Sequence, residues 1–371
     1  MSRARDFADL ASAYSQDSLG KRNLLYNGDM SVAQRGTSKT GYAHDTSGYY
    51  FTSDRWAIDV GGSTGGVFTL TQDTDSTAPF PEAYKIACTT ADTSIAAGEY
   101  AILSQALEGR DLARIRKGNS DAKKLTVSFW CKADASLTYG ISLRDDDNDR
   151  ICNSTFNVTT SWNRVSVTFP ADTNGEYLNH DNNTSMTLYI WLHAGSTYTG
   201  GTFSSLTWAD TVWNTAVSSI GSIYASTSRT FYITGVQMET GEVATPFEHE
   251  SYADNLARCQ RYYYVLANGA NQPMGTGSWY ASTEIDWFAK TPVTMRAIPS
   301  LEVATGTNYY RSIGSNTYDD FNGVALASDK SVEGVYLYAT TGTHGASGTQ
   351  GDASIVTALN ASAKVALIAE L

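Results

Sequence analysis

The chain has 371 residues, which is long enough for two domains of ordinary size and for at least one large core. Hydrophobic residues make up 42% of the chain and charged residues only 17%, with 31 glycines, 23 tyrosines and 7 prolines, a composition that favours strands joined by many turns. The formal net charge is −12, so a polyanion such as DNA would be repelled, and this argues against nucleic acid as a partner.

The sequence shows neither a signal peptide nor a membrane span. The first residues lack an apolar stretch, and no run approaches the roughly 18 apolar residues that a membrane helix needs. The four cysteines, Cys88, Cys131, Cys152 and Cys259, form no CxxC pair, so neither a zinc ribbon nor a redox dithiol is indicated. Their spacing leaves a disulfide between two of them open. We expect reduced cysteines that serve packing in a chain folded in a cytoplasm, without membrane insertion.

Residues 1–22 are predicted to form a short helical anchor. An apolar stripe at helical spacing consists of Phe7, Leu10, Ala11 and Tyr14, and Gly20 can end the helix. So short a helix is marginal alone in water, so it must pack on something. It can dock on its own domain, or it can form contacts with other chains.

Residues 23–250 show short runs of period-two alternation separated by clusters of Gly, Asn, Asp and Ser. The clearest runs are Val67–Thr71, Leu125–Cys131, Arg164–Phe169, Met186–Leu192 and Thr230–Val236. Strands with one apolar face are typical of antiparallel sheets in a sandwich. We therefore predict a jelly roll or a related β-sandwich, with the long loop 194–229 as the place where binding usually sits.

A connecting helix is predicted for residues 251–265, because Ser251 and Asp254 resemble a capping box and Leu256, Cys259 and Tyr263 follow at helical spacing. Residues 266–371 return to the strand pattern. Their predicted strands are Ala281–Ala289, Ser300–Ala304, Val332–Ala339 and Lys364–Ala369. The predicted fold class is thus mainly β: an antiparallel β-sandwich with a short N-terminal helix, a connecting helix and a smaller C-terminal β-domain.

Several segments, in this order along the chain, resemble one known family. They are the run from Asn23 to Gly36 (NLLYNGDMSVAQRG), Thr52–Trp56 (TSDRW), Gly235–Gly241 (GVQMETG) with Ala244–Glu248 (ATPFE), Leu256–Tyr263 (LARCQRYY) and Val293–Pro299 (VTMRAIP). In combination they resemble the fibre and tail-appendage proteins of tailed bacteriophages whose body is similar to a carbohydrate-binding-module jelly roll. The leader Ser2–Asp6 also looks like that of such fibres.

The resemblance implies a location in the virion, after assembly in the host cytoplasm, as a homo-oligomer, most often a trimer. Phe7, Leu10, Ala11 and Tyr14 would then contact other phage virion proteins or further copies of the chain. The implied function is recognition of bacterial surface polysaccharide and host attachment. A purely architectural role, as a capsid-decorating fibre or a tail adaptor, is the alternative, because a shared fold does not prove sugar binding.

Candidate glycan ligands come from the loop after Trp191. Sugars present C–H patches that stack on indole and phenol faces, and their hydroxyls need nearby amides and carboxylates. The residues that fit this chemistry are Tyr198, Trp208, Asp210, Trp213, Asn214 and, on the last strand of the sandwich, Gln237. Loop tryptophans also pack under their own loops, and Gln237 with Glu239 suits an ordinary sheet-surface pair, so both structural interpretations stay open.

The acidic run at residues 145–150 raises the question of a structural calcium ion. Asp145, Asp147 and Asp149 place oxygen ligands at alternate positions, as that ion prefers. However, Arg150 and Phe156 stand where an EF-hand loop has its glycine and its bidentate glutamate. A solvated acidic hairpin tip is the alternative, and no other metal or cofactor is expected.

No catalytic residue is predicted. The sequence has no nucleophile elbow, HExxH or P-loop motif, and its five histidines are scattered: His44, His180, His193, His249 and His344. A glycosidase needs only two carboxylates roughly 5 to 9.5 Å apart, which a sequence cannot test. A polysaccharide depolymerase is therefore a third hypothesis, behind the two roles without catalysis.

Overall fold

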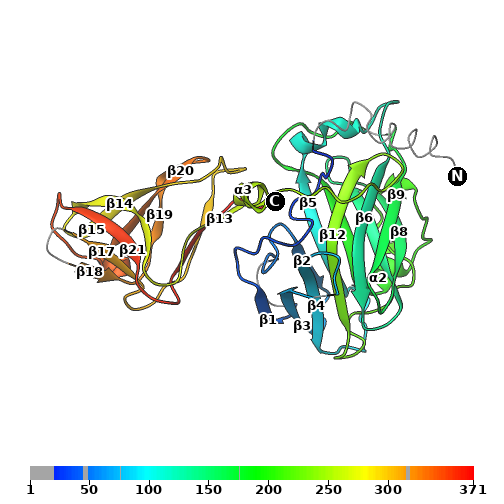
Figure 1. Cartoon of the computed structure of the whole chain (residues 1–371), viewed down its shortest axis with the longest axis horizontal. Helices are drawn as coiled ribbons and strands as arrows, with labels where there is room; N and C mark the ends of the chain where they lie inside the picture. Colours follow the sequence, from blue (N-terminus) through cyan, green and yellow to red (C-terminus); the bar gives the residue numbers. More distant parts are fainter. Residues whose placement is uncertain (1–20, 45–48, 76, 175, 315–317) are drawn as a thin grey trace. The chain divides into compact units, whose positions relative to one another are not determined.

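The structure, a computed structural model, describes residues 21–44, 49–75, 77–174, 176–314 and 318–371. The chain divides into two compact units (Figure 1). The N-terminal unit extends to Tyr252 and also takes in Leu371, and the C-terminal unit runs from Ala253 to Glu370. Both consist largely of antiparallel strands, so the predicted mainly β fold is confirmed.

Two antiparallel sheets form the N-terminal unit (Figure 1). In the described residues, the first sheet has the order β1 (Ser38–Tyr42), β3 (Val67–Asp73), β4 (Ala83–Thr90), β12 (Thr230–Thr240), β6 (Leu125–Ala133) and β9 (Asn163–Phe169). The second has the order β11 (Trp208–Asp210), β8 (Arg150–Val158), β7 (Leu137–Asp145), β10 (Thr184–Ala194), β5 (Tyr100–Glu108) and β2 (Ala57–Gly61). The 3₁₀ helix η2 (Gly109–Ile115) follows β5.

The core of the N-terminal unit lies between its two sheets. Alternation along each strand turns one set of side chains inward, and rings from the two sheets meet there. Phe129 of β6 packs edge-on against Phe156 of β8, with ring centroids 5.0 Å apart, and Tyr139 of β7 meets Phe231 of β12 at 5.5 Å. Cys88, Cys131 and Cys152 of this unit are buried and form no disulfide, and the same holds for Cys259 of the C-terminal unit.

The segment that precedes the first strand lies along β12, where the pairing of β12 with β4 ends at Ile233. The Leu24 amide donates to the Met238 carbonyl and the Val236 amide donates to the Gly28 carbonyl, both at 2.8 Å. Residues 23–30 and 230–240, which belong to the family-like segments at the two ends of the sandwich, therefore lie close together. Gly28 is needed for this approach rather than for a positive φ, because a Cβ there would lie 2.1 Å from the Val236 carbonyl oxygen.

The C-terminal unit begins with helix α3 (Tyr252–Gln260). In the described residues, a short sheet pairs β13 (Tyr263–Asn268), β22 (Lys364–Ile368) and β16 (Ser300–Val303). A longer sheet has the order β18 (Tyr318–Phe321), β17 (Tyr310–Ile313), β21 (Ala353–Ala358), β14 (Gln272–Ala281), β15 (Glu284–Lys290), β20 (Gly334–Thr340) and β19 (Ala325–Ser331). Helix α4 (Thr341–His344) follows β20.

The helix predicted for residues 251–265 is shorter than expected. It ends at Gln260, and Tyr263 lies in β13, where it pairs with Ile368 of β22. Tertiary pairing overrides the local helical spacing there, because β22 needs a partner on this side.

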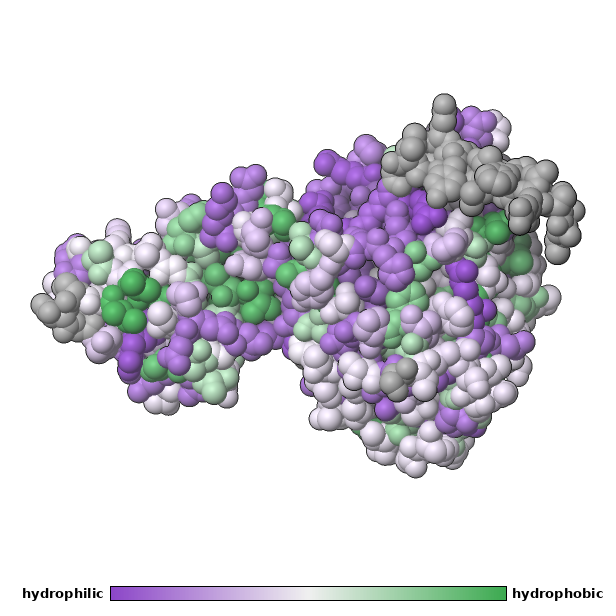
Figure 2. Space-filling model, in the orientation of Figure 1, coloured by the Kyte–Doolittle hydropathy of each residue, from purple (hydrophilic) through white to green (hydrophobic). Residues whose placement is uncertain are grey.

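Hydrophobic residues reach the surface in several patches on the face of the C-terminal unit that Figure 2 shows.

The predicted anchor residues Phe7, Leu10, Ala11 and Tyr14 lie outside the described residues. Within the residues that the structure describes, no helix has the length and apolar character needed to cross a membrane.

Candidate functional site

A cavity of about 360 Å³ opens on the outer face of the second sheet, the face turned away from the core. It shares three lining residues with a neighbouring cavity of about 390 Å³. We call the first cavity the aromatic cleft and define it by the residues Asp59, Tyr100, Ile102, Tyr189, Trp191, Thr197, Tyr198 and Trp213.

Cross-strand register builds the floor of the aromatic cleft. Asp59 of β2 lies opposite Ile102 of β5, which in turn lies opposite Trp191 of β10. Directly opposed residues in a sheet project from the same face, so these three form a row across the strands. Tyr100 and Tyr189, two positions from Ile102 and Trp191, extend the same face. Segments far apart in the sequence therefore supply one surface.

The loop between β10 and β12 supplies the walls. Tyr198 comes from helix α2 (Ser196–Thr199) and Trp213 from the 3₁₀ helix η3 (Trp213–Thr215). The Val217 amide donates to the Tyr198 carbonyl at 3.3 Å, which ties the two turns together. Gly140 of β7, opposite Trp191, leaves the space that the Val217 side chain fills, since a Cβ there would lie 2.3 Å from it.

The aromatic rings differ in how much they reach solvent. Trp191 is 0% exposed, and its indole N–H donates to the Ser142 hydroxyl at 3.1 Å, so it is a buried support. Trp213 is 37% exposed, with its ring centroid 6.3 Å from that of Trp191 and the Arg144 guanidinium 5.4 Å from its centre. Tyr198 packs edge-on against Tyr100 at 5.4 Å. The cleft thus presents ring faces held by a rigid base.

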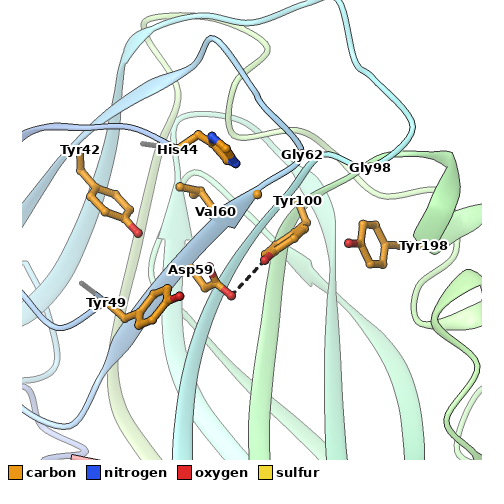
Figure 3. Close-up of a pocket in the computed structure, with 10 residues that line it drawn as sticks. Tyr42, His44, Tyr49, Asp59, Val60, Gly62, Gly98, Tyr100 and Tyr198 are labelled. Carbon is orange, nitrogen blue, oxygen red and sulfur yellow. Dashed lines mark hydrogen bonds between the residues drawn. The ribbon is translucent and has the colours of Figure 1, made fainter. Parts of the chain in front are cut away.

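Asp59 is the carboxylate of the cleft (Figure 3). The Tyr100 hydroxyl donates to it at 3.2 Å. Tyr42, His44 and Tyr49 line the neighbouring cavity, which Asp59 also lines. Burial raises the pKa of Asp59 above its ordinary value, although the Tyr100 hydrogen bond opposes the shift. Burial also raises the pKa of Tyr100, and the Asp59 charge adds to this. The site therefore holds a carboxylate acceptor beside phenol donors.

The structure brings some of the predicted glycan ligands together and separates others. Tyr198 and Trp213 line the aromatic cleft, whereas Asn214, the exposed residue after Trp213, is not among its lining residues. Trp208 and Asp210 belong to β11, which the order of the sheet separates from β10 by two strands. The Trp208 indole donates to the Pro170 carbonyl at 2.7 Å. Asp210 is an exposed side chain 3.4 Å from Arg150.

The expectation that Gln237 lies in the same site is corrected by the structure. Gln237 belongs to β12 of the first sheet and is fully buried. Its amide donates to Glu239 at 2.8 Å and to the Thr245 hydroxyl at 3.1 Å, and its oxygen accepts from the Glu248 amide at 2.8 Å. Gln237 therefore fastens the segment after β12 to that strand.

The three aspartates considered for calcium are engaged by different partners. Asp145 is buried and pairs with the Lys117 ammonium, Asp147 accepts from Asn179 at 2.7 Å and Asp149 accepts from Arg144 at 2.9 Å. The run does form the tip of the hairpin between β7 and β8, but Asp145 is not solvated there. Within the described part of the chain, no group of three or more acidic, histidine or cysteine side chains could hold a metal ion.

Three side chains inside the sandwich, Ser222, His193 and Glu99, contact one another in the serine–histidine–acid order of a hydrolytic catalytic triad. The Ser222 hydroxyl lies 2.8 Å from His193 Nδ1, and Glu99 Oε2 lies 3.4 Å from Nε2. His193 and Glu99 are both buried, and Ser222 also accepts from the Tyr224 amide at 3.1 Å. A substrate carbonyl cannot reach a buried imidazole, so these contacts connect β10 to the following loop.

Sequence reasoning missed Asp59, Tyr100, Ile102 and Tyr189. Each lies in a strand, where a polar or aromatic outward residue looks ordinary, and only the register between strands brings them together. The one local signal was the alternation at Ala57–Gly61, which places Asp59 on the outer face.

No family model and no curated protein matches the sequence. Among solved structures, the enzymatically active domain of tailspike protein 4 from bacteriophage CBA120 is 10% identical with a TM-score of 0.31, and the match covers 59% of this chain but only 21% of that one. The module TmCBM61 in complex with β-1,4-galactotriose is 9% identical with a TM-score of 0.32 over 60% of this chain and 100% of that one.

A family 11 carbohydrate-binding module from Clostridium thermocellum, in complex with a mixed-linked tetrasaccharide, is 10% identical with a TM-score of 0.26 over 57% of this chain and 99% of that one. Values this low assign no function to the chain. The function must come from its own residues.

Proposed function

We propose that the chain is a saccharide-binding protein and that the aromatic cleft is its binding site. The observation that carries the proposal is the partly exposed ring of Trp213, packed against the buried Trp191 ring in the cavity that Asp59 also lines. The C–H patches of a sugar ring stack on indole and phenol faces, while its hydroxyls donate to a carboxylate and accept from phenols.

The competing interpretation is that Trp213 packs beneath its own loop. The space beneath this loop is already filled by Ala216 and Val217, since both are buried against Ile102 and Trp191. Trp213 instead keeps part of its ring in solvent. This division of roles supports a ligand contact for Trp213.

We further propose that the chain is a fibre or appendage protein of a tailed bacteriophage that adsorbs to bacterial surface polysaccharide without cleaving it. This finer proposal rests on the sequence resemblance. The anchor at residues 1–22, the trimer and the contacts with other virion proteins belong to it and remain predictions.

The architectural alternative is favoured by where the family-like segments lie. Asn23 accepts from the amides of Leu25 and Met238, at 3.1 Å and 3.0 Å, and its own amide donates to the Val236 carbonyl at 3.0 Å. These residues, like Gln237, hold the sandwich closed and do not reach the aromatic cleft. The resemblance therefore concerns the scaffold, and the cleft supplies the separate argument for binding.

The test is a screen of the full chain against an array of bacterial surface glycans, followed by calorimetric titration of the best ligand. Trp213→Ala should weaken binding by about 2 kcal/mol, roughly thirtyfold, because aromatic anchors at the centre of a site carry most of the affinity. Trp208→Ala is the matched control and should leave the affinity unchanged. If the chain retains no glycan, or if Trp213→Ala binds as well as the native chain, the cleft is not a saccharide site.

The virion role needs a separate experiment. Antibodies against the chain should label purified phage particles at an appendage. Particles that lack the chain should lose adsorption if it binds the host, and keep adsorption if its role is architectural.

A further inference from the structure

The C-terminal unit has a cavity of its own, with a volume of about 470 Å³, on the outer face of its longer sheet. We call it the C-terminal cavity. Its described lining consists of Tyr280, Glu284, Asp286, Leu326, Ala327, Ser328, Asp329, Tyr336 and Tyr338.

Strand alternation determines which side chains line this cavity. Along β15, Ile285 and Trp287 are buried in the core, so Glu284, Asp286 and Phe288 project to the other face. Asp286 lies directly opposite Tyr338 of β20, and Phe288 opposite Tyr336. The result is a carboxylate next to a row of rings on one sheet surface.

A bulge in β19 raises one wall of the cavity. Leu326 pairs with Leu337 and Lys330 pairs with Val335, so residues 327–329 stand opposite Tyr336 alone. Bulges of this kind bend a strand and redirect its side chains, and they are frequent beside functional sites. Here Asp329 lies within the bulge and lines the cavity together with Tyr336.

The rings of the cavity reach solvent without a covering element in the described chain. Tyr280 is 69% exposed and Tyr336 is 47% exposed, and Tyr336 is kept upright by Phe288, with ring centroids 5.4 Å apart. Large exposed rings grouped around a hollow mark a binding surface rather than ordinary surface scatter.

The charge of the cavity has one sign. Its described lining includes three carboxylates, from Glu284, Asp286 and Asp329, and no lysine, arginine or histidine. Asp286 is half-buried, and in the described residues it has no hydrogen-bond or ion-pair partner. Burial raises the pKa of Asp286, and the negative charge of Glu284 raises it further. A positively charged ligand would offset the repulsion between Asp286 and Glu284.

We propose that the C-terminal cavity binds a saccharide that carries a protonated amine, with the tyrosine rings against its C–H face and the carboxylates around its ammonium group. Ring faces attract cations as well as C–H groups, and a carboxylate strengthens a hydrogen bond from an ammonium donor. This site is independent of the aromatic cleft, because it lies in the other unit and differs in the charge it selects.

The test compares two ligands of equal length, a β-1,4-linked glucosamine tetramer and its N-acetylated form, by calorimetric titration of the full chain at constant ionic strength. The amine form should bind, and the acetylated form should bind at least about tenfold more weakly, since acetylation removes the positive charge. Asp286→Asn should weaken binding of the amine form by about tenfold, as should Tyr336→Ala.

Glu333→Gln is the matched control, because it removes one exposed carboxylate from the same unit outside the cavity and should leave the affinity within about twofold. Trp213→Ala separates this site from the aromatic cleft and should also leave binding of the amine form unchanged. The thermal unfolding of each variant shows whether it is folded. Equal binding of the two tetramers, native affinity in folded Asp286→Asn, or loss confined to Trp213→Ala would each overturn the proposal.

Discussion

The Lys117 ammonium is a buried charge of the N-terminal unit. It pairs with Asp145, lies 3.4 Å from Asp172 and donates to the Glu176 carbonyl at 3.3 Å, with all three charged side chains buried. Lys117→Met should lower the free energy of unfolding by about 3–5 kcal/mol, because it leaves the buried Asp145 carboxylate without its counter-charge, whereas Asp172 keeps the Arg150 guanidinium at 2.8 Å. Urea unfolding measures this.

The control for that prediction is Lys124→Met, which removes an exposed partner of Glu242 and should change stability by less than about 1 kcal/mol. A Lys117→Met chain as stable as the native one would show that the Asp145 carboxylate does not depend on Lys117.

Asp75 should make stability depend on pH. The Lys132 ammonium, helped by the Thr77 amide and hydroxyl, holds the pKa of this carboxyl well below its usual range. Because the pKa is depressed in the folded state, the stabilisation is present above the unfolded value and is lost as the pH falls toward the folded one. Between about pH 5 and pH 2, the native chain should therefore lose more unfolding free energy than Asp75→Asn. Parallel losses in the two chains would contradict this.

At the residue scale, the sequence indicated which types of side chain could bind a ligand, but not which side chains contact one another. Of the loop aromatic residues that were predicted as glycan ligands, Tyr198 and Trp213 line one cavity and Trp208 lies apart in β11. Their role as ligands stays a prediction. The acidic run at residues 145–149 does lie at a hairpin tip, but the burial of Asp145 could not be predicted, because its partner Lys117 follows η2 and lies outside the local pattern. Gln237 was misplaced because period-two alternation shows only that a strand has two faces. It does not show which of the two faces the segment after β12 covers.

At the scale of elements, the contact between residues 23–28 and β12 closes the sandwich. Gly28→Ala should destabilise the chain by about 1–3 kcal/mol, because its Cβ would lie 2.1 Å from a backbone oxygen that cannot move aside cheaply. Gly65→Ala is the matched control, since its Cβ would meet only Asp92, at an ordinary 3.5 Å. Thermal unfolding distinguishes them, and equal midpoints would show that the segment from residue 23 does not need its close approach to β12.

The elements that could be predicted are those whose pattern is local. The runs at 125–131 and 186–192 lie in β6 and β10, because alternation continued for several residues. Strand β14 escaped notice, since Gly275 and Gly277 interrupt its pattern, and both positions lie close against Trp287. The spacing of Leu256, Cys259 and Tyr263 predicted too long a helix, because nothing in that segment shows that Tyr263 pairs with β22.

At the scale of the molecule, the two units have separate cores. That of the C-terminal unit includes the buried side chains Trp287, Tyr310, Phe321, Leu337 and Val356. Residues 253–371 expressed alone should therefore fold, with a cooperative thermal transition and a strand-type circular dichroism spectrum. In the full chain, Trp287→Ala should lower one unfolding transition by the equivalent of about 3–5 kcal/mol and leave the other in place. A fragment without a cooperative transition would mean that this unit depends on the other one.

The arrangement of strands into two sheets, and the aromatic cleft that results, could not be read from the sequence. Alternation predicted that a sandwich exists, but Asp59, Ile102 and Trp191 come together only through the order β2-β5-β10. Long-range pairing of this kind leaves no local trace in a single sequence.

The most direct measurement of the central claim is fluorine NMR of the full chain labelled with 5-fluorotryptophan. Each resonance is assigned by a Trp→Phe variant, and the spectrum is recorded with and without the best glycan of the array. A saccharide in the aromatic cleft should shift the resonance of the exposed Trp213 most. Trp208, on the far side of β8 and β7, and Trp279 and Trp287, in the other unit, should keep their positions. A bound glycan that shifts Trp208 and leaves Trp213 unchanged would contradict the account.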